Sequence, residues 1–243
     1  MWPFNVYPLA VASARYGRLF CSRTMTCEAM QKSLPGLRDL PNGNVMGLYN
    51  AEISAGSLML PESRRIAGLL LTSPSREQWC AALKLDNLLQ KKTPATAHRQ
   101  AQLIRKRLET LEEEGLKLIA TGSQEVATQL LFAASIKHSR IFADFLLDVY
   151  AGKLRRLEQN LSPAKDWDAF MAECVQRDPE LANLRASTKA KVLQVILRVL
   201  AEGRYVDSTK TLRLTPPHLH PDAVSYLKRR GETEVLATMD MTG

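Results

Sequence analysis

Two stretches of the sequence place basic side chains opposite a helical stripe of apolar ones, a pattern typical of a surface that binds a polyanion. In the first stretch, every charged residue from Lys91 to Arg107 is basic. Helical spacing puts Ala97, Ala101, Ile104, Leu108 and Leu111 on one stripe, which predicts the buried side. The opposite face predicts phosphate contacts. Its candidate DNA-binding residues are Lys91, Lys92, Thr93, Thr96, His98, Arg99, Gln102, Arg105 and Lys106.

The order of charges along this first helix also favours an anionic ligand. Thr93 is the predicted N-cap and Pro94 the first helical residue, and the helix is expected to run to about Glu114, with Gly115 able to end it. A helix dipole favours acidic residues first and basic residues last. Here the basic residues come first and Glu109 begins the acidic ones. That reversal is reasonable if the N-terminal half of the helix neutralises phosphates.

The second stretch is a predicted helix over residues 187–201, followed by a predicted β-hairpin after Gly203. Val192 and Ile196 belong to its apolar side. Glutamine and arginine side chains are suited to base edges, whereas lysine and serine are suited to phosphate oxygens. The candidate DNA-binding residues are Ser187, Lys189, Lys191, Gln194 and Arg198 on the helix, with Lys210 and Arg213 on the hairpin.

The elements around these helices predict an all-α protein of two helical lobes, each with a helix-turn-helix and the second winged by the hairpin. A helix opening at Pro61 and a short one carrying Trp79, Leu83 and Leu85 precede the first basic helix. A bundle that does not bind DNA would have a similar outline. We expect an extension and linker (residues 1–48), an N-terminal lobe (49–161), a C-terminal lobe (162–227) and a tail (228–243). The apolar stretch 123–161 is expected to be the buried scaffold.

Composition restricts the function classes. A net charge of +8 and a pI near 9.4 favour a polyanionic partner. The sequence contains no nucleophile–base pair, glycine-rich phosphate loop or zinc-protease motif, so we expect no enzyme and no cofactor. Scattered cysteines predict reduced thiols in a cytoplasmic protein, without a metal site. No apolar stretch is long enough for a bilayer, and we expect a monomer that does not contact membranes.

Several motifs together resemble the BrxA family of bacteriophage-exclusion (BREX) defence systems. They lie in residues 49–67, in 87–91, 96–99 and 104–108, and in 136–137, 144–145, 187–191 and 200–203. The resemblance covers about Tyr49 to Leu219 and leaves residues 1–40 unmatched. It implies an all-helical fold with helix-turn-helix elements, DNA binding, and a role among other BREX proteins. The DNA-contacting residues named above come from the helical faces and are not assigned by the family motif.

Two other functions fit the same pattern. One is an RNA-binding helical protein of the antitermination-factor type, which would use the same basic faces but prefer RNA in competition. The other is a structural adaptor whose basic faces bind acidic patches on another defence protein, with negligible affinity for free nucleic acid at physiological salt.

Overall fold

Capping residues fix where the helices of this chain begin. Ser75 forms a capping box with Gln78, and the hydroxyls of Thr93 and Ser123 accept the backbone N–H groups of Thr96 and Val126. The structure is a computed structural model that describes residues 47–241. Its elements are η1 (Glu52–Ala55), α2 (Leu60–Leu71), α3 (Arg76–Lys84), α4 (Pro94–Leu108), α5 (Glu113–Thr121), α6 (Gln124–His138), α7 (Arg140–Asp144), η2 (Phe145–Tyr150), α8 (Ala151–Arg155), α9 (Pro163–Arg177), η3 (Pro179–Asn183), α10 (Ala186–Glu202), α11 (Pro221–Arg229) and α12 (Thr233–Asp240).

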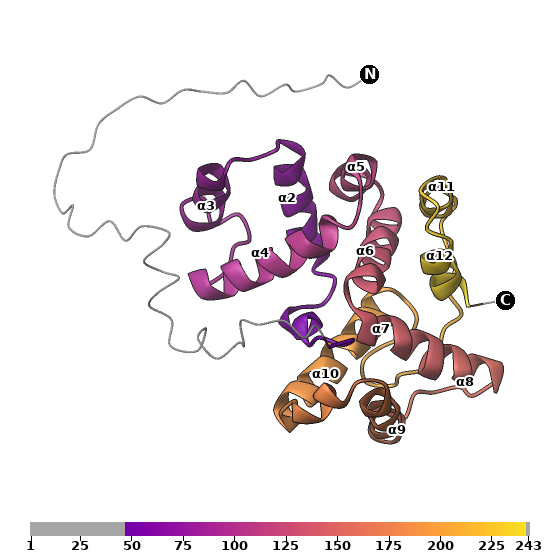
Figure 1. The fold of residues 1–243 in the computed structure, drawn as a ribbon. Helices are drawn as coiled ribbons and strands as arrows, with labels where there is room; N and C mark the ends of the chain where they lie inside the picture. Colours follow the sequence, from indigo (N-terminus) through magenta and orange to yellow (C-terminus); the bar gives the residue numbers. More distant parts are fainter. Residues whose placement is uncertain (1–46, 242–243) are drawn as a thin grey trace, which may run out of the picture. The chain divides into compact units, whose positions relative to one another are not determined.

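The all-α prediction is confirmed for the described part of the chain, and α6 is its central helix. Apolar residues surround the axis of α6 instead of forming one stripe, and nearly all of them from Val126 to Ile136 are buried. A helix that is apolar on all sides must be covered on all sides. Accordingly, α2, α4 and α5 pack against it, as do α7, α11 and α12 (Figure 1).

The core is continuous across the predicted lobe boundary at Leu161–Ser162. Tyr205, from beyond that boundary, stacks on Phe132 of α6 with ring centroids 4.2 Å apart. The hydroxyl of Tyr150 donates to the backbone oxygen of Tyr205 at 2.7 Å. The described residues, 47–241, accordingly belong to one compact unit. Helical periodicity finds the apolar faces, but it cannot show which faces share a core.

Three predicted details differ from the structure. The first basic helix ends at Leu108, and Gly115 lies inside α5, where a Cβ atom would be 2.4 Å from Oη of Tyr226. Gly115 therefore permits a close approach of helices and does not end one. Leu85 lies just beyond α3 and is 82% exposed. The predicted tail, residues 228–243, contains α12, whose Val235 and Met239 are buried in the core.

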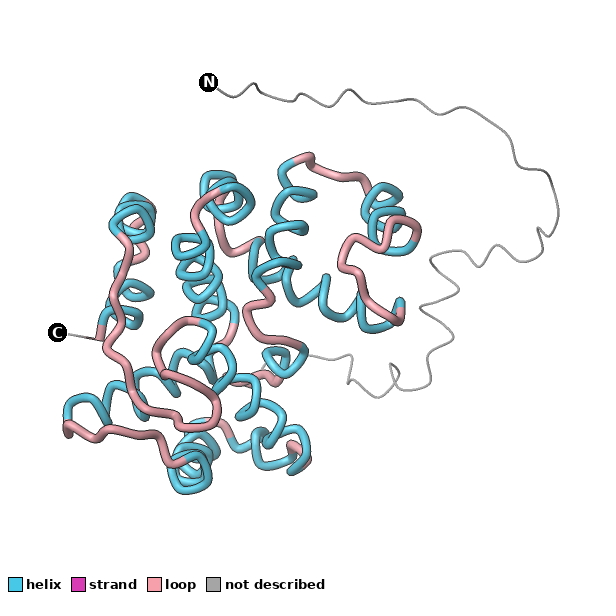
Figure 2. The backbone as a smooth tube through the Cα atoms, turned by 180° about the vertical axis from the view of Figure 1, so that it is seen from behind, coloured by secondary structure: helices cyan, strands magenta, loops and turns pink. Residues whose placement is uncertain are grey.

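The predicted hairpin is a loop closed by isolated bridges, and no strand is formed within residues 47–241. Val206 pairs with Leu214, and Arg213 pairs with Asn160, each in antiparallel fashion. Figure 2, drawn from behind, shows the whole connection from α10 to α11 as loop. The side chain of Asp207 explains the irregular path, because it binds the hydroxyl of Thr211 and the backbone N–H of Arg213 across the turn. These bonds take the place of a regular ladder.

Candidate nucleic-acid interface

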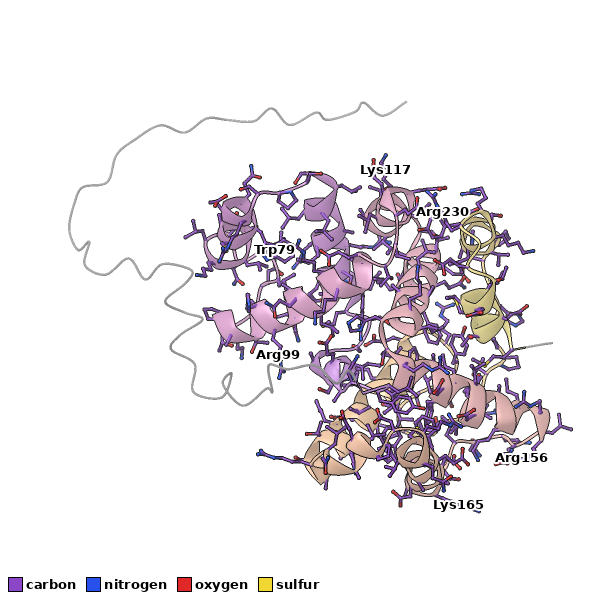
Figure 3. The ribbon with its side chains drawn as sticks, viewed as in Figure 1. Trp79, Arg99, Lys117, Arg156, Lys165 and Arg230 are labelled. Atoms are coloured by element: carbon purple, nitrogen blue, oxygen red, sulfur yellow. The ribbon has the colours of Figure 1, made fainter. Side chains whose placement is uncertain are left out.

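The polar face of α4 is exposed and its apolar stripe is buried, as the sequence predicts. Thr93 caps the helix and Pro94 opens it. Ala97, Ala101, Ile104 and Leu108 are buried, whereas the side chains on the other face reach solvent (Figure 3, below α4 at Arg99). The exposed members of the predicted set are Lys92, Thr93, His98, Arg99, Gln102, Arg105 and Lys106, while Lys91 and Thr96 are half-buried.

Carboxylates neutralise part of this basic face. Nζ of Lys106 lies 2.6 Å from Oε1 of Glu52 in η1, and Lys91 pairs with a glutamate of α2, Glu62, at the same distance. Arg105 pairs with Glu109 one turn later, and its guanidinium lies 4.9 Å from the ring centroid of Trp79. The pairs of Lys106 and Arg105 are half-exposed, so solvent screens them, whereas the pair of Lys91 is more buried; each supplies a competing anion for its cation.

The uncompensated charge lies in the first half of α4 and directly before the helix. Lys92 and Arg99 make no ion pair in the part of the chain that the structure describes. One turn beyond Arg99, Gln102 is hydrogen-bonded to His98, with 2.9 Å between Nε2 atoms. A charge concentrated at the N-terminal half is suited to phosphates, because the helix dipole adds to it there.

Arg107 is the exception in the basic run. It belongs to the basic run from Lys91 to Arg107 but was not among the candidate DNA-binding residues. It is only 2% exposed and donates to the backbone oxygens of Ser57 (2.5 Å) and Gly56 (3.1 Å). Burial, partly offset by the charge of Glu202, lowers its pKa to about 10. It is therefore charged at neutral pH and is a structural residue. Its position on the flank of the apolar stripe, beside Leu103 and Leu108, is the sequence feature that could have indicated this burial.

The second basic helix, α10, also has the predicted face. Ser187, Lys191, Gln194 and Arg198 are exposed, Lys189 is half-buried, and Val192, Val195, Ile196 and Val199 are buried. Lys191 donates to Oε1 of Gln194 at 2.8 Å. No acidic residue occurs between Arg185 and Ala201, so this face is basic over the length of the helix. Arg185, the exposed N-cap residue, was not in the predicted set.

The predicted wing contributes less positive charge than the sequence indicates. Lys210 and Arg213 are both exposed, but the carboxylate of Asp207 lies at the base of the same loop. The hydroxyl of Thr211 and the backbone N–H groups of Arg213 and Ser208 bind that carboxylate and lower its pKa despite some desolvation. Asp207 is therefore an anion at neutral pH, in the same loop as the two predicted cations.

The short helix η1 lies between the two basic helices and packs against both α4 and α10 (Figure 1). Its Glu52 accepts from Lys106 on one side and lies 3.1 Å from Nε2 of His138 on the other. Burial opposes ionisation of Glu52, but the hydrogen bond and charge of Lys106, with His138, outweigh it and lower its pKa. Burial first, then the charge of Arg107, lower the pKa of His138, which is therefore neutral at pH 7.

The connections before α4 and α10 are longer than those of a simple helix-turn-helix. Such a motif has a turn of roughly three to four residues. Here the chain between α3 and α4 runs from Leu85 to Thr93, and the chain between α9 and α10 contains η3. The geometry therefore provides two exposed basic helices, each preceded by another helix, without the tight turn.

Elsewhere, charged groups form internal ion pairs. Asp144 is buried and accepts from the hydroxyl of Tyr49 (2.7 Å), and it pairs with Arg140 and Arg177. Burial raises the pKa of the Cys174 thiol to about 11. Residues 47–241 contain no cluster of histidine, cysteine and carboxylate side chains able to hold a metal ion. Within the same range, no helix is long and apolar enough to cross a membrane.

The BrxA family model matches residues 47–231, which is most of the chain. This chain belongs to the BrxA family. Two relatives, each named BREX protein BrxA, match over most of both chains. The one from Paramagnetospirillum magneticum is 40% identical over 194 residues, covering 80% of this chain and 97% of the relative. The one from Escherichia coli is 36% identical over 189 residues, covering 78% and 88%.

A similar fold has been solved by crystallography. A crystal structure described as an uncharacterized protein from Magnetospirillum magneticum has a TM-score of 0.74 to this structure at 38% identity. The likeness covers 80% of this chain and 99% of that one. A third relative, BREX protein BrxA from Bacillus cereus, is 24% identical over 186 residues. The residues that the family model matches include α4 and α10, so both basic helices belong to the BrxA unit.

Proposed function

We propose that this BrxA protein is a cytoplasmic, non-catalytic component of a BREX phage-defence system that binds double-stranded DNA through α4 and α10. The observation that carries the proposal is the uncompensated positive charge on two exposed helix faces. Lys92 just before α4, Arg99 on α4, and Lys191 and Arg198 on α10 have no carboxylate partner among residues 47–241. Phosphates would supply the missing counter-charge.

The side-chain types on these faces favour the phosphate backbone over base sequence. Lysine and arginine bind phosphate oxygens in any sequence, whereas reading bases requires several side chains held against one groove. Gln102 and Gln194 are the uncharged side chains able to reach a base edge, and each is already hydrogen-bonded to a neighbour on its own helix. We therefore expect weak sequence selectivity.

The test is a titration of duplex DNA at several salt concentrations. Affinity falls as salt rises, and each lost phosphate contact should reduce the magnitude of the slope of log affinity against log salt by about 0.9. The α4 variant Lys92→Ala/Arg99→Ala and the α10 variant Lys191→Ala/Arg198→Ala should therefore each lower it by up to about 1.8. A flat salt dependence of the unchanged protein would contradict the proposal.

A matched control removes the same charge where carboxylates already neutralise it. Arg229 pairs with Glu114, and Arg230 pairs with Glu112 at 2.5 Å. Figure 3 shows Arg230, at the end of α11, away from Arg99 on α4. Arg229→Ala/Arg230→Ala should change binding less than either helix variant. An equal loss would mean that affinity follows net charge and not the two faces.

The same titration distinguishes DNA binding from the two other functions, RNA binding and a structural adaptor role. An RNA-binding protein would bind RNA more tightly than duplex DNA in direct competition. An adaptor for other BREX proteins would bind neither at physiological salt. Turnover of DNA or nucleotide that persists through further purification would contradict the non-catalytic part of the proposal.

A further inference from the structure

Residues 56–58, between η1 and α2, are held from two sides by the two basic helices. From α4, the guanidinium of Arg107 donates to the backbone oxygens of Gly56 and Ser57. From the end of α10, the carboxylate of Glu202 accepts from the hydroxyl of Ser57 at 2.7 Å and from the backbone N–H of Leu58 at 2.8 Å. The segment thus offers its oxygens to one helix and its hydrogens to the other.

This junction, residues 56–58 with Arg107 and Glu202, lies where α10 is attached to the rest of the fold. Among the helical elements, α10 packs most extensively against η1, which ends next to the junction and also packs against α4. Ser57 and Leu58 are both buried. Losing Glu202 would leave the hydroxyl and the N–H without these acceptors, and buried polar groups require partners.

The charges of the junction are complementary as well. Among residues 47–241, no carboxylate lies within ion-pair distance of Arg107, and the charge of Glu202 is the opposite charge that acts on it. Residues 56–58 therefore lie between a buried cation and a carboxylate, each on a different basic helix. An arrangement of this kind resists sliding of either helix along the segment, because a shift would move the hydrogen-bond donors away from their acceptors.

We propose that Glu202 is a positioning residue which, through residues 56–58 and Arg107, fixes α10 relative to α4 so that both helices bind one DNA duplex at the same time. The inference rests on the proposed function. When two binding sites on one rigid body engage the same duplex, the overall affinity can exceed that of either site alone by roughly 10²–10⁴-fold. The gain is lost when the geometry prevents both sites from binding together.

The test depends on whether removing the Glu202 carboxylate strengthens or weakens DNA binding. Removing a carboxylate makes the protein more positive, so electrostatics alone predicts tighter DNA binding for Glu202→Gln. The junction predicts the opposite. On a duplex of about 30 base pairs, near three helical turns, Glu202→Gln should weaken binding by about tenfold. On a duplex of about 8 base pairs, shorter than one turn, its affinity should equal or exceed that of the unchanged protein.

Two further variants complete the experiment. Ser57→Ala removes one of the two bonds to Glu202 without changing charge, and it should weaken binding to the long duplex alone. Glu125→Gln, which removes an exposed carboxylate in the first turn of α6, is the charge control and should leave binding equal or tighter on both duplexes. Thermal melting of each variant confirms that the folded protein is being compared.

The outcomes are distinct. A loss by Glu202→Gln and Ser57→Ala on the long duplex alone supports the inference. Unchanged or tighter binding of Glu202→Gln on the long duplex overturns it, and so does an equal loss on both lengths in a protein that melts normally. If the unchanged protein binds neither duplex with a salt dependence, the proposed function itself fails, and that result is visible without any variant.

Discussion

Glu52 should limit DNA binding, because it occupies Lys106 on the face that we propose to meet phosphates. Glu52→Gln keeps the shape of the side chain, removes its charge, and releases Lys106 from a pair 2.6 Å long. Lys106 lies on the same stripe of α4 as Arg99 and Gln102. Once released, its ammonium group is free to pair with a phosphate. We therefore expect Glu52→Gln to bind DNA more tightly.

The expected size of the change follows from counterion release. One additional phosphate contact steepens the slope of log affinity against log salt by about 0.9, which is about 1 kcal/mol, or about fivefold, at 0.15 M salt. The accompanying loss of folding stability should be small. Both side chains are about half-exposed, and exposed pairs of this kind contribute only about 0.2–1 kcal/mol in solution. Because the pKa of Glu52 is lowered, that contribution is present at neutral pH and is lost as pH falls below the ordinary glutamate range.

The assay is fluorescence anisotropy with one labelled duplex across a salt series. Glu113→Gln is the matched control, since Glu113 forms a comparable exposed pair with Lys117 at 2.7 Å on α5. Figure 3 shows Lys117 above α5 and Arg99 below α4. Both variants gain one unit of positive charge and release one lysine. An equal gain from both, or no change in the slope for Glu52→Gln, would refute the assignment of the α4 face.

Three further outcomes test the packing. Arg107→Met should lower the free energy of unfolding by about 2–4 kcal/mol in chemical denaturation, because two buried carbonyls lose a charged donor. A loss below about 0.5 kcal/mol, the range of an ordinary surface change, would contradict its structural role. Gly115→Ala should destabilise by about 1–2 kcal/mol through its clash with Tyr226, although alanine favours helices, and Tyr226→Phe in the same chain should reduce that cost. Cys174, buried and with a pKa of about 11, should resist alkylation at pH 8 until the protein is unfolded, as followed by mass spectrometry; rapid native labelling would show that this core opens.

Local patterns in the sequence were sufficient to locate the two basic helices. Thr93 followed by Pro94 is a start signal whose physics lies within one turn, since the hydroxyl accepts a nearby N–H and proline lacks the donor that would be unpaired. The alternation of apolar and polar residues in α10 similarly requires only the helical repeat. The confirmed faces of α4 and α10 depend on nothing beyond these rules.

Features that depend on distant residues were decided only by the tertiary structure. Gly115 has the same local signal whether it ends a helix or admits the ring of Tyr226, which comes from far along the chain. Arg107 has the same charge as its neighbours, and only the approach of residues 56–58 gives it carbonyl partners and makes its burial tolerable. The partners of Lys106 and Glu202 are likewise distant in sequence. Periodicity fixes which way a side chain points from its own helix, but what it meets there depends on chain segments that no local rule brings together.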